Sequence, residues 1–185
     1  MRDVGLVKEL QATGKDFFTL PDLEKLTGLD RKSLHVSLHR LVKRGAIQRA
    51  MRGIYVIPGS GPRVERIAGE LYFPCYLSFE TALFSRFGVL NLVPYSLTFA
   101  TTHNTKTLDI LERRVDYRQM KPDLFYGFDM SDGYYIAKPE NALLDLAYLS
   151  MLGKAALPVE ELDLRNISPT IMDELAGRFP PRVRE

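Results

Sequence analysis

The sequence predicts an α+β protein, with an N-terminal winged helix-turn-helix followed by a mixed α+β C-terminal domain. Residues 3–57 give the order helix, helix, turn, helix and two-stranded ribbon. The breaker-rich stretch Pro58-Gly-Ser-Gly-Pro62 comes next, and strand-like and helical patterns are mixed after it. We therefore expect domains at residues 1–58 and 64–185, joined by a linker at 59–63.

The first two helices follow from apolar spacing and from residues that end or begin helices. Apolar residues recur at helical spacing at Val4, Leu6, Val7 and Leu10. Gly14 ends this run. Thr19 is placed to cap a second helix, in whose first turn Pro21 loses no hydrogen bond. The stretch Thr27-Gly28-Leu29 then predicts a tight turn.

The third helix begins after Asp30, whose carboxylate suits the free N–H groups of a helix start. Its apolar stripe consists of Leu34, Leu38 and Leu41. Gly45 ends it. Ala46–Ala50 and Ile54–Ile57 then predict two strands of a hairpin, with Gly53 in the turn between them.

The second domain shows both strand-like and helical segments. The predicted strands are Ser96–Ala100, Val115–Gln119 and Tyr134–Ala137. The predicted helices are Ser78–Phe87, Glu140–Met151 and one around Pro169–Gly177. Residues 63–71 fit either a short helix or an extended arm. Ser78 and Glu140 are interpreted as caps of their helices rather than as catalytic groups, and His103 as a turn residue.

Charge is unevenly distributed along the chain. Residues 1–60 hold 11 Lys and Arg against 6 Asp and Glu, whereas residues 61–185 hold 14 against 17. The net charges are therefore +5 and −3. A basic excess confined to the first third is expected if that third binds a polyanion.

The third helix presents a basic side opposite its leucine stripe, which is the arrangement that enters a DNA major groove. The residues expected to read bases near the helix start are Arg31, Lys32, Ser33, His35 and Val36. Those expected to face the groove or the phosphates further along are His39, Arg40, Lys43 and Arg44. On the ribbon, Arg49 and Arg52 are candidates for backbone or minor-groove contacts. A winged helix used for protein contact is the alternative.

The sequence gives no support for a metal site, a cofactor or a membrane span. Cys75 is the single cysteine, which excludes a disulfide framework and a cysteine-based zinc site. His35 and His39 have metal-ligand spacing but lack a third ligand nearby, so they are interpreted as groove-facing imidazoles. No apolar run reaches about 18 residues, and the N-terminus lacks a signal-peptide core. A cytoplasmic protein is expected.

The enzymatic alternative considered for the second domain is a nuclease. Asp123 followed by Ile136-Ala137-Lys138 has the spacing of a restriction-type nuclease core. Ile136, however, stands where the second Mg²⁺-binding carboxylate belongs. The Asp-x-Asp pair that nucleotidyltransferases use occurs nowhere in the chain. We therefore expect no catalytic residues.

Three blocks of the second domain, together with the preceding winged helix, resemble AbiEi-type antitoxins. They are Tyr76-Leu-Ser78-Phe-Glu80-Thr-Ala-Leu83 with Gly88, Pro94-Tyr-Ser-Leu-Thr-Phe-Ala-Thr101, and Ile136-Ala-Lys-Pro139-Glu140-Asn-Ala-Leu-Leu-Asp145. These antitoxins are winged-helix regulators of type IV (abortive-infection) toxin–antitoxin systems. The most specific block is the last one.

The resemblance implies an autoregulating repressor. Its first domain would bind inverted repeats in double-stranded DNA upstream of its own operon, and two copies on a palindromic operator are expected. Its second domain would counter a nucleotidyltransferase-like toxin. The family offers no catalytic residues, and its signature residues are equally explained by caps and helix–sheet packing. A stand-alone regulator that senses a small ligand in the second domain remains the further alternative.

Overall fold

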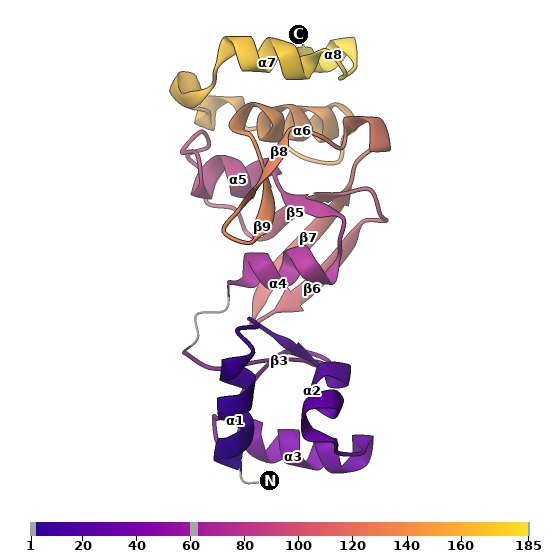
Figure 1. Ribbon diagram of the computed structural model, residues 1–185. Coiled ribbons are helices and arrows are strands. Elements are labelled where there is room, and N and C mark those ends of the chain that lie inside the picture. The colour runs from indigo at the N-terminus through magenta and orange to yellow at the C-terminus, as the bar shows by residue number, and fades with distance from the viewer. Residues whose placement is uncertain (1–2, 60–62, 185) are drawn as a thin grey trace. The chain divides into compact units, whose positions relative to one another are not determined.

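The computed structural model describes residues 3–59 and 63–184 (Figure 1). Within them the chain forms two compact units. The first consists of residues up to Ile67 together with Asp109–Glu112, and the second consists of Ala68–Leu108 and Arg113 onward. The predicted linker at 59–63 falls largely on residues 60–62, which lie outside the described residues.

The helices of the first unit are α1 (Asp3–Ala12), α2 (Leu20–Thr27) and α3 (Arg31–Lys43). Thr19 caps α2 as predicted, and it does so in a reciprocal pair with Asp22. The Asp22 backbone N–H donates to the Thr19 hydroxyl at 3.2 Å, and the Thr19 N–H donates to the Asp22 carboxylate at 2.9 Å. This pair satisfies two of the free N–H groups at the start of the helix.

A three-stranded sheet completes the first unit, in the order β1-β3-β2. Its strands are β1 (Phe18–Thr19), β2 (Gln48–Met51) and β3 (Ile54–Val56), all paired antiparallel. The predicted hairpin is therefore present, and a third strand from before α2 joins it. Gly53 has φ +81° in the hairpin turn, a conformation that glycine adopts at little cost.

The core of the first unit brings the three helices and the sheet together. Leu34, Leu38 and Leu41 of α3 are each at most 1% exposed. They belong to a cluster that also contains Leu6 and Leu10 of α1. Its other buried members are Phe18, Leu23, Ile47, Tyr55 and Ile57. The predicted helix order, leucine stripe and ribbon thus assemble into a winged helix-turn-helix.

The second unit is built on a six-stranded mixed sheet in the order β6-β7-β5-β4-β9-β8. The strands are β4 (Cys75–Leu77), β5 (Leu97–Thr101), β6 (Lys106–Ile110), β7 (Arg113–Gln119), β8 (Phe128–Ser131) and β9 (Tyr134–Ala137). The pairs β4–β9 and β5–β7 are parallel, and β4–β5 and β8–β9 are antiparallel. The α+β fold class is confirmed, although β4, β6 and β8 were not predicted.

The helices of the second unit are α4 (Val64–Leu71), which begins in the first unit, α5 (Phe79–Ser85), α6 (Pro139–Met151), α7 (Pro169–Ala176) and α8 (Pro181–Arg184). Single 3-10 turns lie at η1 (Pro122–Leu124), η2 (Val159–Glu161) and η3 (Leu164–Asn166). The alternative of a helix at residues 63–71 is therefore correct. Figure 1 shows α7 and α8 packed beyond α6, away from the sheet.

Of two predicted helix caps, Ser78 is correct in position only and Glu140 is wrong. Ser78 occupies the position before α5, but its side chain makes no capping bond and its hydroxyl donates to Asp145 at 2.7 Å. Lys138, not Glu140, precedes α6, and the Glu140 carboxylate accepts from the Ser168 backbone N–H at 2.8 Å. Both side chains make tertiary contacts because both are fully or nearly fully buried, at 0% and 3% exposure.

Asp145 is the buried polar centre of the second unit. One oxygen, Oδ2, accepts from Tyr76 at 2.9 Å, Ser78 at 2.7 Å and Asn141 at 3.2 Å, which ties α6 to β4. The other oxygen, Oδ1, has no hydrogen-bond partner in the described part of the chain. Burial therefore raises the pKa of Asp145 to about 7, although the bonds from Ser78 and Tyr76 oppose the shift.

The Asp145→Asn substitution should change how stability depends on pH. The folded protein keeps the Asp145 proton to about pH 7, whereas the unfolded chain loses it near pH 4. Wild-type stability, relative to the variant, should thus be greatest below about pH 4 and decline as the pH rises to about 7. The expected decline is a few kcal/mol, at about 1.4 kcal/mol per pH unit.

Urea unfolding of both proteins between about pH 4 and pH 8 measures this difference. Subtracting the variant removes the contributions of other titrating groups, such as Asp22, that the two proteins share. A difference in the free energy of unfolding that stays constant over this range would contradict the assignment.

Candidate nucleic-acid interface

Helix α3 has one buried and one exposed side. Its buried side is the leucine stripe described above, and Val36, on the other side, is 61% exposed. All of the predicted contact residues of this helix and of the turn after it are exposed: Arg31, Lys32, Ser33, His35, Val36, His39, Arg40, Lys43 and Arg44. The core thus leaves a continuous cationic side accessible on a helix without a single acidic residue.

The start of α3 is held by its cap and by the turn before it. Asp30 accepts from the Lys32 and Ser33 backbone N–H groups at 2.9 and 3.2 Å, as predicted. The Ser33 hydroxyl also donates to Asp30 at 2.6 Å, and this bond is the main cause that lowers the pKa of Asp30. Ser33 is predicted to read bases, but its hydroxyl proton is already donated to the capping residue Asp30.

The turn between α2 and α3 depends on Gly28. This residue ends α2 with φ +64°, and its N–H donates to the Glu24 carbonyl at 2.9 Å. The angle at which α3 leaves α2 is thus determined by a left-handed residue, which side chains other than glycine adopt at a cost.

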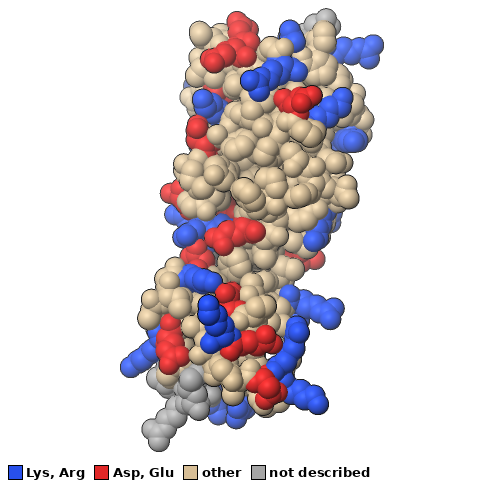
Figure 2. Space-filling view, turned by 45° about the vertical axis from the view of Figure 1, so that its right-hand side comes forward, with Lys and Arg blue, Asp and Glu red and all other residues tan. Residues whose placement is uncertain are grey.

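Most of the cationic groups on α3 are not neutralised within the protein. Arg31 lies 3.8 Å from the Glu24 carboxylate, a loose pair with the arginine side chain 71% exposed. Such an exposed pair contributes little and dissociates readily. Within the described residues, Lys32, Arg40 and Lys43 form no ion pair. Figure 2 shows Lys and Arg side chains projecting from the end of the first unit where Figure 1 draws α3.

The ribbon carries its two predicted cations on exposed positions. Arg49 lies on β2 next to a register shift between Arg49 and Met51, and its Nε donates to the Met51 carbonyl at 3.3 Å. Arg52 lies in the turn that Gly53 closes. The exposed Gln48, at the start of β2, is a further donor beside these two arginines.

In the second unit, charged and polar residues that the sequence offers as candidate functional groups make structural contacts with distant parts of the chain. Glu80 of α5 receives two bonds from Arg118 of β7, at 2.9 and 2.8 Å. Asp123 lies exposed in η1, while Ile136 is buried on β9 at 7% exposure. The position where a nuclease would need its second carboxylate is thus part of the apolar core. Within the described residues, no cluster of three or more His, Cys, Asp or Glu is placed to hold a metal.

A family of known proteins matches the part of the chain that forms the winged helix. A family model described as transcriptional regulator, AbiEi antitoxin, matches residues 6–58. The resemblance is therefore shown over the winged helix, and it supports a DNA-binding regulatory role. The blocks of the second unit that carry the resemblance lie outside this match. No curated protein matches the chain. No helix in the described residues has the length and apolar character needed to cross a membrane.

Replacing Gly28 by alanine should destabilise the first unit by about 1 kcal/mol, because the left-handed conformation costs alanine free energy that it does not cost glycine. An added methyl would meet no atom within 4 Å, so steric overlap does not contribute. Gly5→Ala is the matched control. Gly5 lies inside α1, also with nothing within 4 Å, and its replacement should stabilise by roughly 0.5–1 kcal/mol. Chemical unfolding followed by circular dichroism measures both changes; effects of the same sign would contradict this account of the turn.

Proposed function

We propose that the protein is a sequence-specific DNA-binding repressor and the autoregulating antitoxin of a type IV toxin–antitoxin pair. The observation that carries the DNA-binding part is the exposed, acid-free cationic side of α3, held in place by a winged-helix core. The family match over residues 6–58 supports the antitoxin part.

In this proposal α3 occupies the major groove and the ribbon lies against the backbone. Residues near the start of α3, chiefly Arg31 and Lys32, would donate to base edges. Arg40 and Lys43, further along, would neutralise phosphates. Inverted repeats would place two copies on the operator, about one helical turn apart.

We assign the second unit to the antitoxin activity, directed at a nucleotidyltransferase-like toxin. The residues of the AbiEi-like blocks in this unit form hydrogen bonds within the protein, as the Glu80–Arg118 and Ser78–Asp145 pairs illustrate. They therefore stabilise the unit, and the toxin would be countered by its surface rather than by a catalytic centre.

Binding to DNA containing the chain's own upstream region should weaken steeply with salt. If about six cations meet phosphates, the log–log slope of affinity against salt is roughly −5. The double variant Arg40→Ala/Lys43→Ala should make that slope shallower by about 2 and weaken all sequences alike. Arg31→Ala should instead reduce discrimination at one base position, with a cost of about 1–3 kcal/mol.

Fluorescence anisotropy titrations on operator and scrambled duplexes measure these effects, with Lys154→Ala of the second unit as the control for loss of one charge. Equal affinity for both duplexes at physiological salt would refute sequence-specific binding.

The antitoxin part predicts that co-expression with a nucleotidyltransferase-like protein from the adjacent reading frame restores growth. A variant with Lys32, Arg40 and Lys43 replaced by alanine should lose repression of a reporter yet still restore growth, because we assign the two activities to different units. Colony counts and reporter output measure the two separately. Loss of both in a variant that folds normally would argue against this division, and failure of the wild type to restore growth would exclude the antitoxin role.

A further inference from the structure

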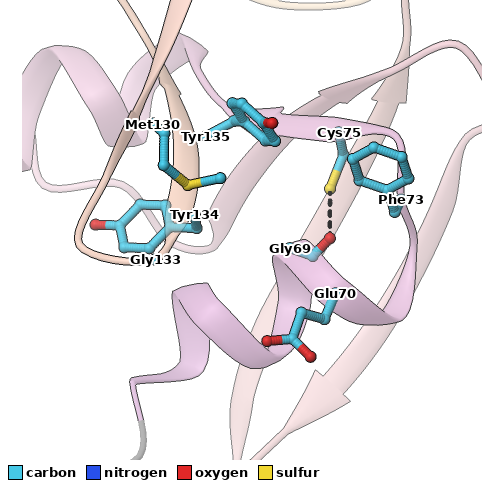
Figure 3. A pocket seen from close by; sticks show the side chains of 8 residues that line it. All are labelled: Gly69, Glu70, Phe73, Cys75, Met130, Gly133, Tyr134 and Tyr135. Carbon is cyan, nitrogen blue, oxygen red and sulfur yellow. Dashed lines mark hydrogen bonds between the residues drawn. The ribbon is translucent and has the colours of Figure 1, made fainter.

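The second unit contains a cavity of about 510 Å³ that the proposed DNA contacts do not use. Figure 3 shows that its lining comes from the end of α4, the start of β4 and the β8–β9 hairpin. The side chains that define its character are Glu70, Phe73, Cys75, Met130, Tyr134 and Tyr135. Its volume is within the range of sites that bind small organic molecules.

The cavity is lined mainly by aromatic rings and by the thioether of Met130. Phe73 is 63% exposed and Met130 is 58% exposed, an uncommon exposure for apolar side chains of this size. The Phe73 and Tyr135 ring centroids lie 6.4 Å apart with their planes tilted by 40°, so the two rings are neighbours on the cavity wall. Aromatic faces carry negative potential and attract cations that come within about 6 Å.

The cavity's electrostatics favour a positive ligand. Glu70 supplies a carboxylate, and it forms no ion pair within the described residues. Among the residues that the structure describes, no Lys, Arg or His lines the cavity. Arg66, one turn earlier on α4, is paired with Asp16 at 2.8 Å and so does not neutralise Glu70.

The backbone adds a further negative contribution. Gly69 and Glu70 lie in the last turn of α4, whose carbonyls have no partner within the helix and carry the negative end of its dipole. The Gly69 carbonyl accepts from the Cys75 thiol with Sγ–O 3.6 Å, and a thiol is a weak donor. Burial raises the pKa of Cys75 to about 12, so the thiol stays neutral and the carboxylate remains the charge of the site.

We propose that this cavity binds a small organic cation, in which an ammonium or guanidinium group is carried on an apolar body. The charged group would lie against the Glu70 carboxylate and the carbonyl end of α4. The apolar body would lie against Phe73, Met130 and Tyr135. A ligand of this kind satisfies the carboxylate and covers the exposed ring and thioether, which a neutral or anionic ligand of the same size does not.

Isothermal titration of the full-length protein with three probes of similar size tests the proposal. Phenethylammonium is the cation, 2-phenylethanol the neutral probe and 3-phenylpropanoate the anion. We expect the cation to bind about tenfold more tightly than the neutral probe, and the anion more weakly than both. Equal affinities, or no measurable binding of phenethylammonium, would overturn the proposal.

Two variants test the assigned contacts. Glu70→Gln should remove the tenfold preference for the cation, and Phe73→Leu, which keeps an apolar side chain but removes the ring, should reduce it several-fold. Both residues are exposed, so both variants should fold as the wild type does. Glu160→Gln on η2, an exposed glutamate outside the cavity, is the matched control and should change nothing. An unchanged preference in Glu70→Gln would overturn the site.

A lysine side chain of a protein partner presents the same ammonium group as a free small amine. Binding of the capped tripeptide Gly-Lys-Gly distinguishes a protein ligand from a small-molecule ligand. Weaker binding of the tripeptide than of phenethylammonium supports a small-molecule site, because the cavity would hold the whole of the smaller ligand. Tighter binding of the tripeptide would overturn this assignment in favour of a protein partner. None of these measurements involves DNA, so their outcome is independent of the proposed repressor role.

Discussion

Burial of three leucines on α3 determines which of its side chains reach solvent. Leu34, Leu38 and Leu41 are at most 1% exposed, and each contributes roughly 1.5–3 kcal/mol by leaving water. Rotating the helix by half a turn would expose this stripe and bury several Lys and Arg side chains without partners, at a much larger cost. The cationic side is therefore outward because the apolar side must be inward.

The same constraint connects the core of the first unit to its proposed chemistry. The Asp30 cap and the left-handed Gly28 determine where α3 begins, and the core determines how it is rotated. An interface that reads base edges needs donors held in a defined register. Here that register is maintained by contacts on the side of the helix that faces away from the candidate DNA surface.

The second unit depends on polar contacts that are buried rather than exposed. Asp145 gathers three donors onto one oxygen, and Glu140 binds a backbone N–H at the start of α7. Both residues lie in the block Ile136–Asp145 that most specifically resembles AbiEi antitoxins. In this chain the block joins α6 to β4 and to the C-terminal helices. Its distinctive residues are explained by packing, which leaves the cavity beside α4 and the surface as the places where the unit can bind other molecules.

The sequence by itself determined the winged helix, because each of its signals is local. A cap, a stripe of leucines at helical spacing and a glycine that needs positive φ act within a few residues of one another. It also determined the charge of α3. Tertiary structure alone decided the roles of Ser78 and Glu140, because a residue at a helix start can bond either to that helix or to a distant group. It likewise decided the cavity at Glu70, Phe73 and Met130, whose lining comes from two segments, 69–75 and 130–135, that are far apart in the chain. No spacing in the sequence indicates that these segments meet, because strand order in a mixed sheet depends on pairings between distant residues.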